Sequence, residues 1–301
     1  MKTELNLMER ERETVVGHVR KLIRKKKLNN SNNNNKKKQT KMMKRPTMLQ
    51  RLFMYCQKLF KGLGTVPSPD DVQNLCRILD VMTPEDVGLS RDLQFFNSAF
   101  LSDRGIPRVT HTCIYECKKF SLTLLIFPAG AVIPLHNHPE MTVFSKLLLG
   151  TMHIKSYDWV DTNNLVGMKP LSQLRLARLK ADRSFTAPCD TSVLYPTSGG
   201  NIHAFTALTP CLVLDVLGPP YSKDDGRDCS FYVDFPCKDI ISSNSFLLNG
   251  TKTMKEEEGD CRYGWLQEIE PPEDAEMDGI EYLGPPVVDV SAMLGSCNSN
   301  M

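Results

Sequence analysis

The sequence predicts a mainly β fold, a sandwich or barrel of short strands that follows a helical segment. From about Val109 to Leu217, short segments rich in Val, Ile, Leu, Phe and Thr are separated by Gly, Pro, Asn and Asp. Strands that recur roughly every 8–12 residues are typical of a sandwich or barrel. Two further observations complete the prediction: residues 47–90 show helical periodicity, and residues 1–46 have the composition of a disordered basic arm.

Residues 1–46 contain 15 Lys and Arg against 4 Asp and Glu, whereas the rest of the chain contains 22 against 31. The stretch from Lys25 to Arg45 consists mainly of Lys, Asn and Ser, which bury too little apolar surface to offset the entropy of ordering. Its basic clusters resemble a nuclear-import signal, although a solubilising tail has the same composition. Direct nucleic-acid binding is not expected, because no aromatic residues lie between the basic ones.

Residues 47–90 are expected to form helices that pack on the β domain. In the first half of this segment, apolar residues recur every three or four positions. A second helix is expected to begin after Ser68, an N-cap residue, with Pro69 in its first turn. A short third element repeats this start pattern at Thr83 and Pro84.

The remaining boundaries follow from composition. One domain is expected over residues 47–286, with its barrel core at about 109–240 and a hairpin loop at 161–170. An acidic, Pro-rich segment closes the domain, and residues 287–301 are expected to form a flexible tail. The ten cysteines show no regular spacing, and no apolar run approaches the roughly 18–20 residues of a spanning helix. We therefore expect an intracellular protein with reduced cysteines and no membrane partner.

The most specific functional signal is a His-x-His pair formed by His136 and His138. Alternate residues of a strand point to the same face, so both imidazoles can bind one ion. The spacing from Gly130 through this pair to Gly150 resembles the first cupin motif, but Val143 occupies the position of the usual Glu ligand. That replacement removes the carboxylate and predicts a ligand set of neutral imidazoles; nearby Glu140 has the wrong spacing to replace it.

A third ligand is expected at His203, which follows the glycine pair of SGGNIHAF as in the second cupin motif. The alternative is an ordinary core or surface histidine. That alternative is favoured for His18, His111 and His153, which lie outside both motifs.

The residue types leave two kinds of metal chemistry open. Imidazole binds Zn, Cu, Fe and Ni, so it does not choose the ion. Three ligands on one face leave positions for a bidentate substrate and O2, and a substrate thiolate would supply the missing negative charge. A zinc ion with one water would instead make a hydrolytic or lyase-type centre.

The chain resembles the plant cysteine oxidases, which share a family with the animal cysteamine (2-aminoethanethiol) dioxygenase. The resemblance runs from about Met48 to Pro286 and is carried by LHNHPEMTVFSKLLLGTMHIKSYDW, SGGNIHAFTA, LDVLGPPYS and GRDCSFYVDFP. It implies a cupin double-stranded β-helix, or jelly-roll barrel, and an Fe(2+) cofactor held by His136, His138 and His203.

The resemblance also implies an activity: oxidation of the N-terminal cysteine of target proteins to the sulfinic acid by O2. The implied targets are group VII ethylene-response transcription factors, which would link the enzyme to the N-degron pathway and to hypoxia sensing. A monomer in nucleus and cytoplasm is expected. The alternatives are a dioxygenase for a small aminothiol such as cysteamine, and a cupin interaction protein without catalysis.

Three further residues are implied to be catalytic. Asp215 would hold the substrate's α-amine or adjust a ligand, because a carboxylate inside the apolar run CLVLDVL is costly without a partner. Tyr221, on the loop after GPP, would orient oxygen or substrate. Cys229 stands at the family's cysteine position; with Phe231 two residues later and Tyr232 one further, a Cys–Tyr crosslink of the kind found in some thiol dioxygenases stays open.

Overall fold

The structure, a computed structural model, describes residues 45–89, 107–161, 173–236 and 263–289. The expected arm up to residue 44, the hairpin loop from residue 162 and the tail from residue 290 lie outside the described residues. No helix in the described ranges is long and apolar enough to cross a membrane. The seven cysteines in these ranges are free thiols in the structure.

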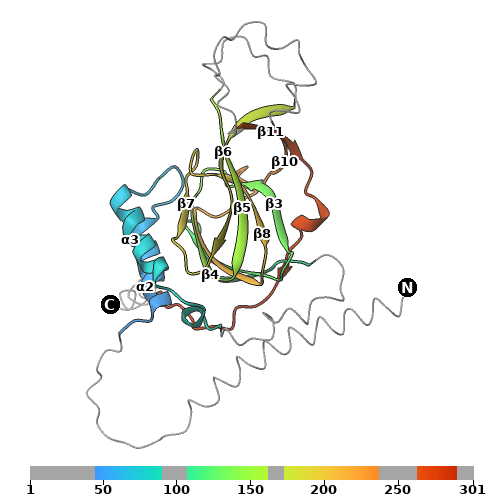
Figure 1. Cartoon of the computed structure of the whole chain (residues 1–301). Coiled ribbons are helices and arrows are strands. Elements are labelled where there is room, and N and C mark those ends of the chain that lie inside the picture. The colour runs from blue at the N-terminus through green and yellow to red at the C-terminus, as the bar shows by residue number, and fades with distance from the viewer. Residues whose placement is uncertain (1–44, 90–106, 162–172, 237–262, 290–301) are drawn as a thin grey trace, which may run out of the picture.

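Two β-sheets make up the body of the molecule (Figure 1). The first contains, in spatial order, β12 (Asp278–Gly279), β1 (Thr110–Glu116), β2 (Ser121–Phe127), β9 (Cys211–Gly218), β4 (Thr142–Leu149) and β7 (Ser192–Leu194). The second contains β10 (Phe231–Pro236), β11 (Tyr263–Ile269), β6 (Leu174–Thr186), β5 (Thr151–Trp159), β8 (Ile202–Ala207) and β3 (Val132–Asn137). It closes on itself because β10 pairs with both β11 and β3. The mainly β, cupin-type double-stranded β-helix is thereby confirmed.

The two sheets pack face to face through their alternate residues. Val213 on β9 joins Phe127 on β2 and Phe205 on β8 in one buried apolar cluster between the sheets. Leu214 and Val216, the neighbours of opposite parity, pack with the helices instead. Every residue of β9 is therefore buried, on one side by the opposite sheet and on the other by the helices.

The helices cover the outer face of the first sheet. They are α2 (Met48–Leu59), α3 (Pro69–Asp80) and the short 3-10 turn η1 (Pro84–Val87); a second 3-10 turn, η5 (Glu273–Ala275), lies beside β3. As predicted, the Ser68 side chain caps α3 by accepting the Asp71 N–H, and Pro69 occupies its first turn. The buried side of α2, which includes Leu52 and Phe53, joins Phe144 of β4 in the largest apolar cluster.

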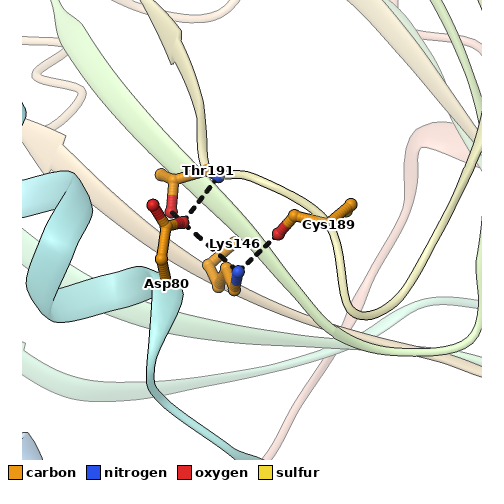
Figure 2. Close-up of polar contacts among 4 residues, drawn as sticks. All are labelled: Asp80, Lys146, Cys189 and Thr191. Atoms are coloured by element: carbon orange, nitrogen blue, oxygen red, sulfur yellow. Dashed lines mark hydrogen bonds and ion pairs between the residues drawn. The ribbon is translucent and has the colours of Figure 1, made fainter.

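A buried lysine fastens α3 to this sheet (Figure 2). Lys146 on β4 is 3% exposed, and its ammonium donates to the Asp80 carboxylate at the end of α3 and to the Cys189 carbonyl. Asp80 also accepts from the backbone N–H and the hydroxyl of Thr191. Burial would raise the pKa of Asp80, but the hydrogen bonds from Thr191 and Lys146 hold it below its usual value.

Replacing Asp80 with alanine is expected to lower the free energy of unfolding by about 3–5 kcal/mol, because it leaves the buried Lys146 ammonium without its counter-ion. Urea denaturation checks this value. The control is Glu276→Ala, which removes the partner of Arg108 from an exposed ion pair of 2.8 Å and is expected to cost less than about 1 kcal/mol. Equal losses in the two variants would contradict the role of burial.

Candidate metal centre

The three predicted histidines meet between the sheets. His136 is the penultimate residue of β3, His138 follows directly after the strand, and His203 is the second residue of β8. Backbone pairing sets His136 opposite His203. The ring centroids lie 4.8–4.9 Å apart in every pairing, and all three residues are at least nine-tenths buried. One detail differs from the prediction: only His136 of the His-x-His pair lies within the strand proper.

The spacing of the ring nitrogens fits one metal ion. The possible ligand atoms lie within 4.8 Å of one another, and the Nε2 atoms of His138 and His203 are 3.2 Å apart. Two nitrogens bound to one ion at about 2.1 Å are separated by roughly 3.0–3.4 Å at angles between octahedral and tetrahedral. The His138–His203 pair already has this spacing, and all three imidazoles are close enough to be ligands of one ion.

Hydrogen bonds to the other ring nitrogens orient two of the ligands. His136 Nδ1 lies 2.8 Å from the Pro134 carbonyl oxygen, which accepts its N–H. His138 Nδ1 lies 2.9 Å from the Tyr221 hydroxyl, which itself donates to the Asn137 carbonyl at 2.9 Å. A proton on each Nδ1 leaves the Nε2 lone pair free, which is the tautomer that a metal ligand requires.

The environment also keeps these rings neutral. Burial lowers the pKa of His136 to about 4, and the Pro134 carbonyl only partly offsets this effect. The pKa values of His138 and His203 lie well below the usual range, first because of burial and second because of neighbouring histidines. Neutral imidazoles bind a cation without first losing a proton, so the site is ready for a metal at neutral pH.

Asp215 lies on β9 between Thr123 on β2 and Ser145 on β4, and its side chain points between the sheets. Val213 and Leu217, two residues to either side, belong to inward-facing clusters, and Leu217 shares its cluster with Tyr221. Asp215 is 6% exposed, and its Oδ1 atom has no hydrogen-bond partner. Burial raises the pKa of this carboxyl to about 7, an effect that a hydrogen bond from Ser145 reduces.

Tyr221 and Cys229 lie together beside His138. The Cys229 thiol and the Tyr221 hydroxyl share a hydrogen bond. Burial raises the pKa of Tyr221 far above its usual value, with further contributions from Cys229 and Asp215. The same cause raises the pKa of Cys229 to about 11. Tyr221 is therefore a second candidate for a Cys–Tyr crosslink with Cys229. The first candidate, Tyr232, lies three residues after this cysteine in the sequence.

The structure also accounts for the residues that the sequence did not select. Val143, at the position of the usual Glu, is 1% exposed in an apolar cluster with Tyr221. Glu140 is exposed in a turn with φ 59, and within the described ranges no carboxylate joins the three histidines. His153 lies at the surface, 3.0 Å from Asp182, away from the cluster.

Some contacts of the site could not be predicted. The Pro134 and Asn137 carbonyls act through the backbone, which leaves no mark on residue type. Ser145 stands beside Asp215 only because β4 and β9 pair in one register. No signal in the sequence marks this contact, because β9 is buried on both faces and β4 is buried at most positions, so neither strand shows the hydrophobic alternation that would assign Asp215 and Ser145 to one face.

Comparison with known proteins agrees with this geometry. The chain is 49% identical to plant cysteine oxidase 2 of Arabidopsis thaliana over 243 residues, which cover 79% of this chain and 83% of that protein. It is 46% identical to plant cysteine oxidase 1 of the same plant over 248 residues, covering 81% of each. It is 29% identical to 2-aminoethanethiol dioxygenase of Mus musculus over 266 residues, covering 80% of this chain and 97% of that protein. The PCO_ADO family model matches residues 78–287, and the chain belongs to this family.

Proposed function

We propose that this protein oxidises the N-terminal cysteine of target proteins to cysteine sulfinic acid with O2, at an Fe(II) ion held by His136, His138 and His203. The observation that carries the proposal is the buried cluster of three neutral imidazoles, which no carboxylate joins within the described residues. The similarity to two plant cysteine oxidases supports the same substrate class.

The ligand set supports iron and a thiolate substrate together. Three neutral ligands leave the full charge of a divalent ion uncompensated, and a substrate thiolate supplies negative charge where other cupins use Glu. Bound Fe(II) would supply the one-electron chemistry that O2 requires and would bring sulfur and oxygen to one centre. Both oxygen atoms end on sulfur, so the reaction needs no external reductant.

The chain's own residues bind and orient the substrate. The unpaired Oδ1 of Asp215 is suited to accept a hydrogen bond from the α-ammonium group of an N-terminal cysteine. Tyr221 fixes the ring of His138 through its hydroxyl. Burial of the three histidines and of Asp215 excludes bulk water from the sulfur while it is oxidised.

The deciding experiment is mass spectrometry of a Cys-initiating peptide after incubation with Fe(II)-loaded protein in air. We expect a gain of two oxygen atoms, both labelled when 18O2 is supplied, and no gain under nitrogen or without metal. A peptide that begins with Ser is the matched substrate control. Cysteamine is tested in parallel, since faster oxidation of cysteamine would favour the small-thiol activity. If neither the peptide nor cysteamine gains oxygen while the metal is bound, the proposed dioxygenase activity is contradicted.

We propose group VII ethylene-response transcription factors as targets, with roles in the N-degron pathway and hypoxia sensing. The similarity to plant cysteine oxidases supports this. The basic clusters of residues 1–46 support residence in the nucleus as well as the cytoplasm. Fluorescent fusions with and without these residues test the location: loss of nuclear signal on deletion supports an import role, and an unchanged distribution contradicts it. Light scattering tests the proposed monomer.

A further inference from the structure

The carboxylate of Asp158, which is not one of the proposed metal ligands, organises the turn that leads into His203. Asp158, at the end of β5, is 9% exposed and accepts three backbone N–H groups from this turn. Its Oδ2 accepts from Gly199 at 3.1 Å, and its Oδ1 accepts from Gly200 at 2.7 Å and from Asn201 at 3.1 Å. His203 follows two residues later, so the carboxylate fixes the start of the strand that carries this ligand.

The turn itself admits little variation. Gly199 and Gly200 both have positive φ, 84° and 86°, which favours glycine. A Cβ atom on Gly200 would lie 2.7 Å from Ser156 Oγ and 2.8 Å from Ser156 Cβ. Two successive glycines in this conformation turn their N–H groups inward, toward the Asp158 carboxylate.

Asn201 connects the same turn to His138. Its Oδ1 accepts the backbone N–H of His138 at 3.1 Å, and its Nδ2 donates to the His138 carbonyl at 2.9 Å. Nδ2 also donates to the Tyr195 carbonyl at 2.8 Å. His138 lies just beyond the end of β3, and in the described structure these two bonds from Asn201 hold both of its backbone polar groups.

We infer that Asp158 and Asn201 are positioning residues for the metal centre. Asp158 fixes the turn before His203, and Asn201, which lies in the same turn, fixes the backbone of His138 through its two hydrogen bonds. Through them one carboxylate controls the distance between two ligands whose Nε2 atoms lie 3.2 Å apart. The inference depends on the proposed metal site and not on the proposed substrate.

The effect follows from how accurately a metal site must be built. Ligand atoms displaced by a few tenths of an ångström bind an ion more weakly, and loss of a residue that orients a ligand lowers metal affinity about 10–100-fold. Asn201→Ala removes both bonds to His138; the buried His138 N–H is left unpaired, and the His138 C=O keeps only the bond from the Met141 N–H. Asp158→Ala removes the acceptor of three N–H groups of the turn, of which those of Gly200 and Asn201 are buried.

The test is titration of the metal-free protein with Co(II), read from its d–d absorption bands, alongside the thermal midpoint of the metal-free form. Asp158→Ala and Asn201→Ala are each expected to weaken Co(II) binding about 10–100-fold and to change the d–d spectrum. The matched control is Asp234→Ala, on β10, whose carboxylate accepts from Lys155 and Tyr157 instead. It is expected to lower the thermal midpoint while Co(II) affinity stays within about twofold.

A purely structural role gives a different pattern. If Asp158→Ala and Asn201→Ala bind Co(II) as the wild type does, with the same spectrum, the inference is wrong, whatever happens to the thermal midpoint. Should Asp158→Ala not fold, Asp158→Asn keeps an oxygen for Gly200 and Asn201 and sets an amide against the Gly199 N–H. An intermediate loss of affinity supports the inference there, and unchanged affinity overturns it. Because the readout is metal binding, an inactive protein with normal Co(II) binding would count against the proposed function alone.

Discussion

Replacing His203 with alanine is expected to abolish sulfinic acid formation and to lower metal affinity by more than about 100-fold. This loss is larger than the one usual for a residue that only orients a ligand. His203 is one of the three proposed ligands, and two imidazoles hold a divalent ion far less firmly. The fold is expected to survive, because the ring is neutral in the wild type and its removal leaves no unpaired charge. The measurements are metal content after dialysis, peptide oxidation and the circular dichroism spectrum.

His153→Ala is the matched control for that variant. It removes the same residue type from the same sheet, on β5, but from a position where the ring is about one-third exposed and pairs with Asp182. We expect full metal content and full activity. Normal metal content and peptide oxidation in the His203 variant, with its fold intact, would exclude the three-histidine site.

The sequence was sufficient to predict the cluster of three histidines, because the motifs that carry them are defined by residue type and short spacing. The His-x-His pair and the glycine pair before His203 fix local backbone geometry, and strand pairing between β3 and β8 then brings the two motifs together. The helix starts were equally local, since Ser68 and Pro69 act within one turn. Features of this kind are predictable because they depend on neighbours along the chain.

Contacts between distant segments were not predictable in the same way. The hydrogen bond between Cys229 and Tyr221 depends on the path of the loop after β9, which residue types do not specify. Asp158 lies in the run SYDW, whose sequence gives no sign that its carboxylate faces three N–H groups of a remote turn. Such roles follow from register and topology, which only the structure supplies.

Burial of the Asp215 carboxylate has a cost in stability. Its carboxyl has a usual pKa of 3.8, and burial raises this to about 7 in the folded protein. Between these values the folded state holds a proton that the unfolded state has lost, so stability falls as pH rises. Above about pH 7 the whole penalty applies, which is at most about 4 kcal/mol for a shift of this size.

Asp215→Asn is therefore expected to change stability and activity in opposite directions. At pH 8 the metal-free variant should be about 2–4 kcal/mol more stable than the wild type, and the difference should shrink as pH falls and disappear below about pH 3, where the wild-type carboxyl is protonated in both states. Peptide oxidation should fall about 10–100-fold at pH 8, because a charged hydrogen bond to the substrate's ammonium contributes about 1.5–3 kcal/mol. Urea denaturation across this pH range and initial rates at saturating iron measure the two effects. A variant less stable at pH 8 would show that the ionised Asp215 is satisfied by groups within the fold, and undiminished peptide oxidation would remove Asp215 from the substrate site.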